Sequence, residues 1–146
     1  MTRYLLDVVT VVALVDRYHK HHAAAAAWAE RTAGARWLTS PIVQNGAFRV
    51  LTRGEYSKGL SGAAQGVYDA LVRFTAQPAH EFVADDISLL DRTHVRDPGR
   101  LTPNNSTDVY PVALARRHGA RLATFDHHVP AGTVHDGDQH LELVDA

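Results

Sequence analysis

Short apolar segments alternate with helix-like segments along this chain, and that alternation restricts the fold more than any other feature. Apolar runs predict buried strands at residues 4–6, 37–39, 80–83 and 121–125, with residues 141–144 a candidate fifth. Parallel strands need long crossover connections, and intervening helices supply them. We therefore expect an α/β fold built as a three-layer sandwich. It has a mostly parallel central sheet of four to five strands and helices on both faces.

Helix signals fill the segments between these strands. Length or one-sided apolar periodicity favours three helices, over residues 9–15, 23–31 and 63–75. Ser40 suits an N-cap and Pro41 suits the first helical position, so a fourth helix begins there and ends near Gly54. We expect these helices to cover the sheet.

The segment after the third strand predicts a short helix followed by a loop. Asp85 and Asp86 suit the N-cap of a helical stretch over residues 87–90. Residues 97–106 are rich in Pro, Gly and Asn, which indicates a loop.

A last helix is expected between this loop and the fourth strand. Thr107 suits its cap, and Gly119 marks its end. Pro111 then falls in the first turn, where a missing backbone N–H removes no hydrogen bond within the helix.

Length, cysteine content and hydropathy restrict the class of protein. The chain has 146 residues, enough for one domain with a hydrophobic core, and we treat residues 1–146 as a single domain. It has no cysteine, which excludes disulfides, thiolate metal sites and cysteine nucleophiles. No apolar run approaches the roughly 20 residues that span a bilayer, and Asp7 comes too early for a secretory signal. We expect a cytoplasmic protein that does not enter the membrane.

The overall charge carries no signature of nucleic-acid binding. Sixteen acidic and fifteen basic residues give a formal net charge of −1, whereas non-specific binding of polyanions needs a basic excess. An enzyme that meets RNA through a local patch and a bound cation remains compatible with this balance. Arg49 and Arg53, one helical turn apart, either hold RNA phosphates or cover apolar surface with their stems.

Three aspartates lie at positions that can meet at the carboxyl edge of the expected parallel sheet. Asp7 and Asp126 each follow an apolar strand, and ligands of open parallel sheets bind beyond the carboxyl ends of the strands. Asp108 follows the expected helix cap, where the helix dipole favours a carboxylate. If the two strands are neighbours, the three carboxylates meet at one edge. An aspartate after a strand is also a common turn or cap residue, so both interpretations stand at this point.

Carboxylates that meet in this way repel one another, and they either raise a pKa or bind a cation. Mg²⁺ or Mn²⁺ is the expected cation, because the site offers oxygen ligands and no sulfur. Such an ion polarises a phosphodiester and activates water. The three aspartates therefore predict metal-dependent phosphodiester hydrolysis.

These aspartates belong to an ordered series of sequence blocks that covers nearly the whole chain. The blocks are Leu5-Leu6-Asp7-Val8, Val11-Val12-Ala13-Leu14, Thr39-Ser40-Pro41-Ile42-Val43-Gln44-Asn45-Gly46, Arg49-Val50-Leu51, Thr107-Asp108, Ala113-Leu114-Ala115 and His118-Gly119-Ala120-Arg121-Leu122-Ala123-Thr124-Phe125-Asp126. In this order they resemble the PIN domain, and specifically the VapC toxins of bacterial toxin–antitoxin systems.

The resemblance implies a Mg²⁺- or Mn²⁺-dependent endoribonuclease that cuts structured RNA such as tRNA or rRNA. It also implies a homodimer and inhibition by a cognate VapB-type antitoxin. By position, Asp7, Asp108 and Asp126 match the family's acidic residues, which bind the metal directly or through water. Gln44 matches a further catalytic position on the helix after the second strand.

Two positions depart from the family pattern. Gln44 stands where the family commonly has a glutamate, and its amide offers a carbonyl oxygen without charge. Val9 stands where PIN domains usually have a small polar residue, two positions after the first aspartate, while Thr10 is adjacent. The alternative function is therefore a catalytically weakened or inactive PIN-like module that binds antitoxin or RNA without cleavage.

Two other classes of function compete less well. Aspartate-nucleophile phosphatases need a second acid two residues after the first, and Val9 occupies that position. A histidine-based transition-metal site is conceivable, but the histidine spacings match no recognised motif and suit solvated loops. The histidines considered are His19, His21, His22, His127, His128, His135 and His140.

We interpret the large aromatic residues as parts of the core or of a dimer contact rather than as surfaces on which RNA bases stack. Trp28, Trp37 and Phe48 are expected in the core or in dimer contacts.

Overall fold

A five-stranded sheet forms the centre of the computed structural model, which describes residues 1–53 and 63–146. The strands are β1 (Arg3–Leu6), β2 (Arg36–Thr39), β3 (His80–Phe82), β4 (Arg121–Thr124) and β5 (Leu141–Leu143). Their order is β3-β2-β1-β4-β5, and every pair of neighbours is parallel. The expected parallel sheet is confirmed, with β3 at one edge.

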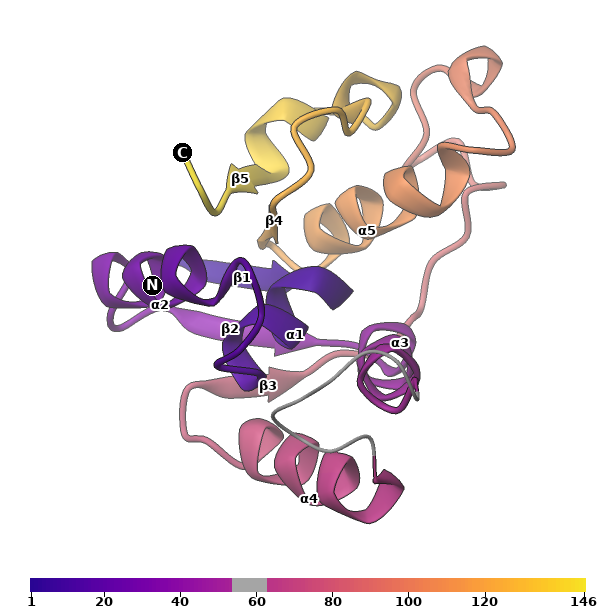
Figure 1. Ribbon diagram of the computed structural model, residues 1–146. Helices are drawn as coiled ribbons and strands as arrows, with labels where there is room; N and C mark the ends of the chain where they lie inside the picture. Colours follow the sequence, from indigo (N-terminus) through magenta and orange to yellow (C-terminus); the bar gives the residue numbers. More distant parts are fainter. Residues whose placement is uncertain (54–62) are drawn as a thin grey trace.

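Helices cover both faces of this sheet. They are α1 (Val8–Val15), α2 (His22–Arg31), α3 (Pro41–Leu51), α4 (Ala64–Thr75) and α5 (Ser106–Arg117). Figure 1 shows α4 beside the β3 edge and α5 near β4. Each helix lies where the sequence predicts one, although Gly54, the expected end of the fourth, lies outside the described residues.

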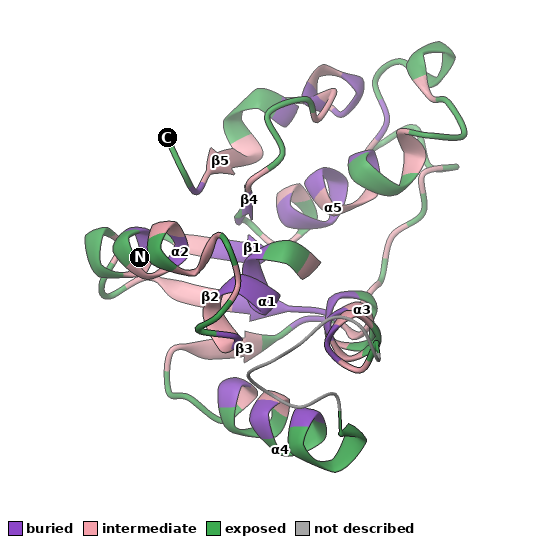
Figure 2. Ribbon diagram, viewed as in Figure 1, coloured by how far each residue is buried: buried purple, intermediate pink, exposed green. Residues whose placement is uncertain are grey.

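The alternation of side chains along β1 divides the core into two layers. Tyr4 and Leu6 pack with apolar residues of α1 to α4, whereas Leu5 packs with Leu122 and the buried face of α5. Successive residues of a strand point to opposite faces, so one short strand serves both layers. Figure 2 shows the resulting buried centre, with exposed positions on the outer sides of α2 and α4. The three-layer sandwich expected from the sequence is present.

Aromatic side chains form the centre of one layer. Trp28 is 1% exposed, meets Tyr4 edge-on with ring centroids 5.0 Å apart, and stacks with Trp37 at 6.3 Å. Trp37 in turn stacks on Phe74 of α4 at 5.8 Å. Phe48 is partly buried against the same cluster. The core assignment of the two tryptophans and Phe48 is confirmed.

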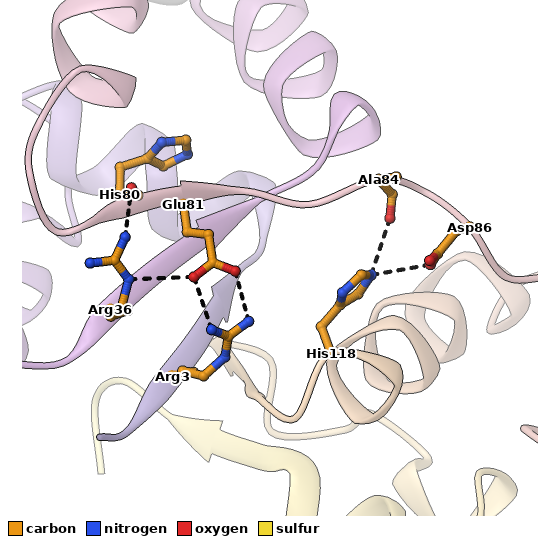
Figure 3. Close-up of polar contacts among 7 residues, drawn as sticks. All are labelled: Arg3, Arg36, His80, Glu81, Ala84, Asp86 and His118. Atoms are coloured by element: carbon orange, nitrogen blue, oxygen red, sulfur yellow. Dashed lines mark hydrogen bonds and ion pairs between the residues drawn. The ribbon is translucent and has the colours of Figure 1, made fainter.

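An ion-pair cluster joins three neighbouring strands at their amino-terminal halves. Arg3 of β1 donates two hydrogen bonds to Glu81 of β3, at 2.9 and 2.8 Å, and Arg36 of β2 lies 3.4 Å from the same carboxylate (Figure 3). The hydrogen bonds from Arg3 are the largest of the effects that hold the pKa of Glu81 below its ordinary value.

The expected helix over residues 87–90 is absent, and the interpretation of Asp85 and Asp86 as its cap is wrong. The Asp85 carboxylate instead accepts the N–H of Ile42 at 2.9 Å in the first turn of α3, and the hydroxyl of Tyr110 at 2.8 Å. Its cap function therefore serves a helix distant in sequence. This use of Asp85 also explains why Ser40, though at the N-cap position, makes no capping hydrogen bond with its side chain.

Asp86 is likewise engaged with another element. Its carboxylate accepts a hydrogen bond from the ring of His118 at 3.1 Å (Figure 3). The same carboxylate lies 3.2 Å from the guanidinium of Arg117. Together, Asp85 and Asp86 fasten the segment after β3 to α3 and to α5.

The start of α5 also differs from the prediction. The helix begins at Ser106, so Thr107 lies inside it and Pro111 lies beyond its first turn. The earlier start follows from reciprocal hydrogen bonds: the side chain of Asn105 accepts the N–H of Thr102 at 2.8 Å, and the Thr102 hydroxyl accepts the N–H of Asn105 at 3.1 Å. Side chains of this type fold back on the nearby backbone and begin a helix.

In the part of the chain that the structure describes, no helix has the length and apolar character needed to cross a membrane.

Candidate active site at the carboxyl edge of the sheet

Asp7 and Asp126 follow two strands that are direct neighbours. In the register of β1 and β4, Leu6 pairs with Ala123, and the backbone N–H of Asp7 continues the pairing to the Ala123 carbonyl at 3.3 Å. Asp126 comes two residues after Thr124, the last residue of β4. The condition that the sequence left open, adjacency of the two strands, is met, and both aspartates follow the carboxyl edge of the sheet.

Asp7 has both a structural and an electrostatic role at this edge. It is the N-cap of α1, because its Oδ1 accepts the N–H of Thr10 at 2.8 Å. Its Oδ2 accepts the hydroxyl of Thr124 at 2.5 Å. Each carboxylate oxygen has a second acceptor site, so these bonds orient Asp7 and leave it able to bind a cation.

Thr124 connects the two aspartates, a role that reasoning from the sequence missed. Its hydroxyl donates to Asp7 and accepts the N–H of Asp126 at 3.1 Å. The side chain of Asp126 is oriented from its other side, because its Oδ1 accepts the N–H of His128 at 2.8 Å. A threonine two residues before a strand-end aspartate was the available signal, but it is equally typical of a buried strand.

The electrostatics link Asp126 to both other aspartates. Burial is the main cause of the raised pKa of Asp7. Hydrogen bonds from Thr124 and Thr10 lower this pKa, and the charge of Asp126 raises it further. Burial also raises the pKa of Asp108, and again the charge of Asp126 adds to it. A carboxylate disfavours ionisation of a second carboxylate only when the two lie close together. The charge of Asp126 therefore acts on both Asp7 and Asp108.

Asp108 lies in the first turn of α5. Both Asp108 and Asp126 are exposed, whereas Asp7 is partly covered. Asp108 and Asp126 are therefore accessible to solvent, whereas hydrogen bonds fix the carboxylate of Asp7.

Gln44 lies on α3 and is bound to neighbouring strands. Its Nε2 donates to the Thr39 hydroxyl at 3.0 Å, and that hydroxyl lies 2.6 Å from Nε2 of His80. The side chain also lines a cavity of about 450 Å³ together with apolar residues of α3 and α4. One N–H of its amide is thus bound to Thr39, which orients the side chain in this cavity.

Val9 and Thr10, the second and third residues after Asp7, differ in how far they are exposed. Val9 is 44% exposed. Thr10 is buried, and its hydroxyl donates to the Ala123 carbonyl at 2.9 Å. The Thr10 side chain thus fastens α1 to β4, and its backbone N–H is the group that reaches Asp7.

The donor chemistry of this edge suits a hard divalent cation held partly through water. Among residues 1–53 and 63–146, no three His, Asp or Glu side chains form a group that could hold a metal ion. Mg²⁺ keeps several waters and typically takes one or two carboxylates directly, so it does not require three direct ligands. Carboxylates whose charges oppose one another's ionisation can be neutralised by a cation instead of a proton.

Several histidines are engaged in local hydrogen bonds. Nδ1 of His22 lies 2.7 Å from the Ala13 carbonyl, and Nδ1 of His140 lies 2.8 Å from the Ala120 carbonyl. Nε2 of His127 lies 2.8 Å from the carboxylate of Asp145. These contacts agree with the structural interpretation of the histidines.

Comparisons with known proteins agree with this geometry. The family model of the PIN domain matches residues 4–131. Ribonuclease VapC44 of Mycobacterium tuberculosis is 40% identical over 125 residues, which are 85% of this chain and 86% of that protein. Ribonuclease VapC38 of the same organism is 38% identical over 125 residues, 84% of each chain.

A solved structure has a similar fold. The crystal structure of Mycobacterium tuberculosis VapC20, described as a sarcin-ricin loop cleaving toxin, gives a TM-score of 0.59. The alignment covers 91% of this chain and 97% of that one at 14% identity. At this identity the similarity concerns the fold alone.

Proposed function

The chain belongs to the PIN-domain family, and from that premise we propose that it is a metal-dependent endoribonuclease, the toxin of a VapBC-type toxin–antitoxin system. Relatives named ribonuclease, at 40% and 38% identity over most of the chain, support cleavage of RNA. The observation that carries the proposal is the negative region in which the charge of Asp126 raises the pKa of both Asp7 and Asp108.

Each aspartate has a distinct part in the proposed mechanism. Asp108 and Asp126, which are exposed, offer carboxylate oxygens to Mg²⁺ or Mn²⁺ and its waters. Asp7 accepts hydrogen bonds from Thr124 and from the N–H of Thr10, and these hold its carboxylate in one orientation. Such orienting partners commonly matter to metal sites almost as much as the ligands.

The metal supplies Lewis acidity and a water of lowered pKa for attack on the phosphodiester. Asp108 and Asp126 would hold the ion, and Asp7 would orient the site. We assign the carbonyl oxygen of Gln44 to a contact with the substrate, because the hydrogen bond from its amide to Thr39 orients the side chain.

The remaining elements of the proposal concern partners. We propose a structured RNA such as tRNA or rRNA as substrate, a VapB-type antitoxin as inhibitor, a homodimer as the assembly and the cytoplasm as the location.

A second candidate function is a PIN-like module that binds RNA or antitoxin without cleavage. The features that favour it are Gln44, which carries no charge where the family commonly has a glutamate, and the exposed Val9, which offers no oxygen ligand.

The experiment is cleavage of purified tRNA and rRNA by the wild-type protein in Mg²⁺, in Mn²⁺ and in EDTA. Cleavage is expected with metal only, and Asp126→Asn should abolish it. The matched control, Asp138→Asn, removes an equal charge from another exposed aspartate and should cleave like wild type. Antitoxin binding without cleavage in either metal would favour the module and rule out the nuclease.

A further inference from the structure

A hydrogen-bonded turn, residues 17–22, lies against the candidate active site. It connects α1 to α2 and is called the 17–22 turn below. Within it, the ring of His21 stacks on Phe125 with centroids 4.6 Å apart and planes 16° from parallel. Phe125 is the residue between Thr124 and Asp126, so the stack places the turn next to the aspartate edge.

The 17–22 turn is held in one conformation by its own hydrogen bonds. Asp16 is 4% exposed; its carboxylate accepts the N–H of Tyr18 at 3.0 Å, and its carbonyl accepts the N–H of His19 at 3.0 Å. The N–H of His21 donates to Nδ1 of His19, also at 3.0 Å. A turn ordered in this way loses little conformational entropy when it binds a partner.

The outer side of the turn presents two cations and an aromatic ring. Arg17, Tyr18 and Lys20 are exposed, with 61% of Tyr18 accessible. The guanidinium of Arg17 lies 4.9 Å from the centre of the Tyr18 ring and donates a hydrogen bond of 2.8 Å to its hydroxyl. This contact orders both side chains without neutralising the charge of Arg17.

We propose that the 17–22 turn is an RNA-contact surface beside the cleavage site, in which Arg17 and Lys20 bind phosphates and Tyr18 stacks on an unpaired base. This inference rests on the proposed nuclease function. The aspartate edge repels RNA, and a chain with a net charge of −1 has no general attraction to offset this. Cations anchored through His21 to the residue before Asp126 supply the local attraction at the required place.

The chemistry of the turn favours RNA over a protein partner. Exposed aromatic rings and arginine planes are the groups on which unpaired RNA bases stack. Paired cations next to a site for phosphodiester chemistry are placed to hold the phosphates that flank the cut.

The test measures binding separately from cleavage. Fluorescence anisotropy follows an RNA hairpin, end-labelled with fluorescein, in EDTA and at increasing NaCl. The variant Arg17→Glu/Lys20→Glu is compared with Arg73→Glu/Arg92→Glu, which makes the same change of net charge at exposed residues of other elements. We expect the Kd of the first variant for RNA to rise about tenfold or more. The slope of log Kd against log salt concentration should fall by the amount expected for the loss of about two phosphate contacts.

A second pair of variants tests base stacking. Tyr18→Ala should raise the Kd about tenfold, in the range measured for loss of one stacked base. Tyr18→Phe keeps the ring and loses only the hydrogen bond from Arg17, so it should bind nearly as wild type. If thermal melting shows that Arg17→Glu/Lys20→Glu is unfolded, Arg17→Gln/Lys20→Gln replaces it in the comparison.

The outcomes separate this inference from the nuclease proposal. RNA binding that is unchanged in the turn variants, or weakened equally in the Arg73/Arg92 control, overturns the inference. A defect confined to antitoxin binding assigns the turn to a protein partner and also overturns it. If the turn variants lose RNA binding while the wild type cleaves no RNA in Mg²⁺ or Mn²⁺, the inference stands and the nuclease proposal fails.

Discussion

The hydroxyl of Thr124 donates a hydrogen bond to the carboxylate of Asp7, with the two oxygens 2.5 Å apart. The same hydroxyl accepts the backbone N–H of Asp126. One side chain at the end of β4 thus fixes the geometry between the aspartates that follow two neighbouring strands.

Replacement of Thr124 by valine tests this connection. Valine has the same shape, but it leaves Asp7 without one of its two donors, so the carboxylate is less well oriented. We expect RNA cleavage to fall by about 10- to 100-fold, as is typical when a partner of a metal ligand is removed. Rates measured in saturating Mn²⁺ give the result, and Thr124→Ser, which keeps the hydroxyl, should retain most activity. Equal rates for valine and wild type would contradict the role of Thr124.

The raised pKa of Asp7 predicts how stability depends on pH. Burial raises this pKa above the ordinary value of 3.8, so the folded protein binds the proton more tightly than the unfolded chain does. The stabilisation is complete below the ordinary pKa and is lost as the pH rises through the raised one. In EDTA, wild type should therefore lose stability relative to Asp7→Asn as the pH rises above about 4.

Urea unfolding of both proteins at several pH values measures this difference. Asp138→Asn, which changes an exposed aspartate, should follow the wild-type curve. Parallel curves for wild type and Asp7→Asn would show that burial does not control the ionisation of Asp7.

The hydrogen-bond chain from Gln44 through Thr39 predicts the titration of His80. Gln44 donates to the Thr39 hydroxyl, and the same hydroxyl lies 2.6 Å from Nε2 of His80, so the three side chains form one chain of hydrogen bonds. Burial already lowers the pKa of His80. In Gln44→Glu a carboxylate replaces the amide beside Thr39, so its negative charge should favour the protonated ring and raise the pKa of His80.

NMR titration of the His80 ring measures this pKa. Gln139→Glu introduces the same charge at an exposed position and should leave the titration of His80 unchanged. A pKa that stays the same in Gln44→Glu would mean that the chain does not control the protonation of His80.

The packing around Gly46 predicts that replacing it by alanine lowers the stability of the protein, although this replacement usually stabilises a helix. A Cβ at this position in α3 would lie 2.7 Å from Cγ2 of Val8 in α1, closer than carbon atoms tolerate. Gly46→Ala should therefore destabilise the protein by about 1–3 kcal/mol, although alanine in an uncrowded helix is about 1 kcal/mol better than glycine. Thermal unfolding of Gly46→Ala, Val8→Ala and the double variant measures the coupling. The double variant should recover part of the loss, and a more stable single variant would disprove the close packing.

Much of the fold was predictable because its elements depend on local patterns. The apolar run before Asp7 and the alanine-rich segment of α2 identify their own secondary structure. Asp85 was misread for the opposite reason: its sequence neighbourhood suits a cap, but the helix that it caps, α3, is distant in the chain.

In the candidate site, too, some features were predictable from the local sequence and others depend on contacts between distant segments. Asp7 and Asp126 could be located because they stand close to the ends of apolar strands: Asp7 directly follows β1, and Asp126 lies two residues after the end of β4. The role of Thr124 depends on which strands are neighbours, and the stack of His21 on Phe125 depends on the path of the chain between α1 and α2. The local sequence therefore does not distinguish these relationships from ordinary features of a buried strand and of a connecting turn.

The most direct test of the account is a crystal structure of the wild-type protein grown with Mn²⁺, in which anomalous scattering locates the ion. We predict one peak at the carboxyl edge of the sheet, bound by Asp126 with Asp7 and Asp108 either as ligands or as acceptors from the ion's waters. A protein that binds Mn²⁺ elsewhere, or that shows no peak at this edge with the metal in excess, would contradict the central claim that these three aspartates form a metal site.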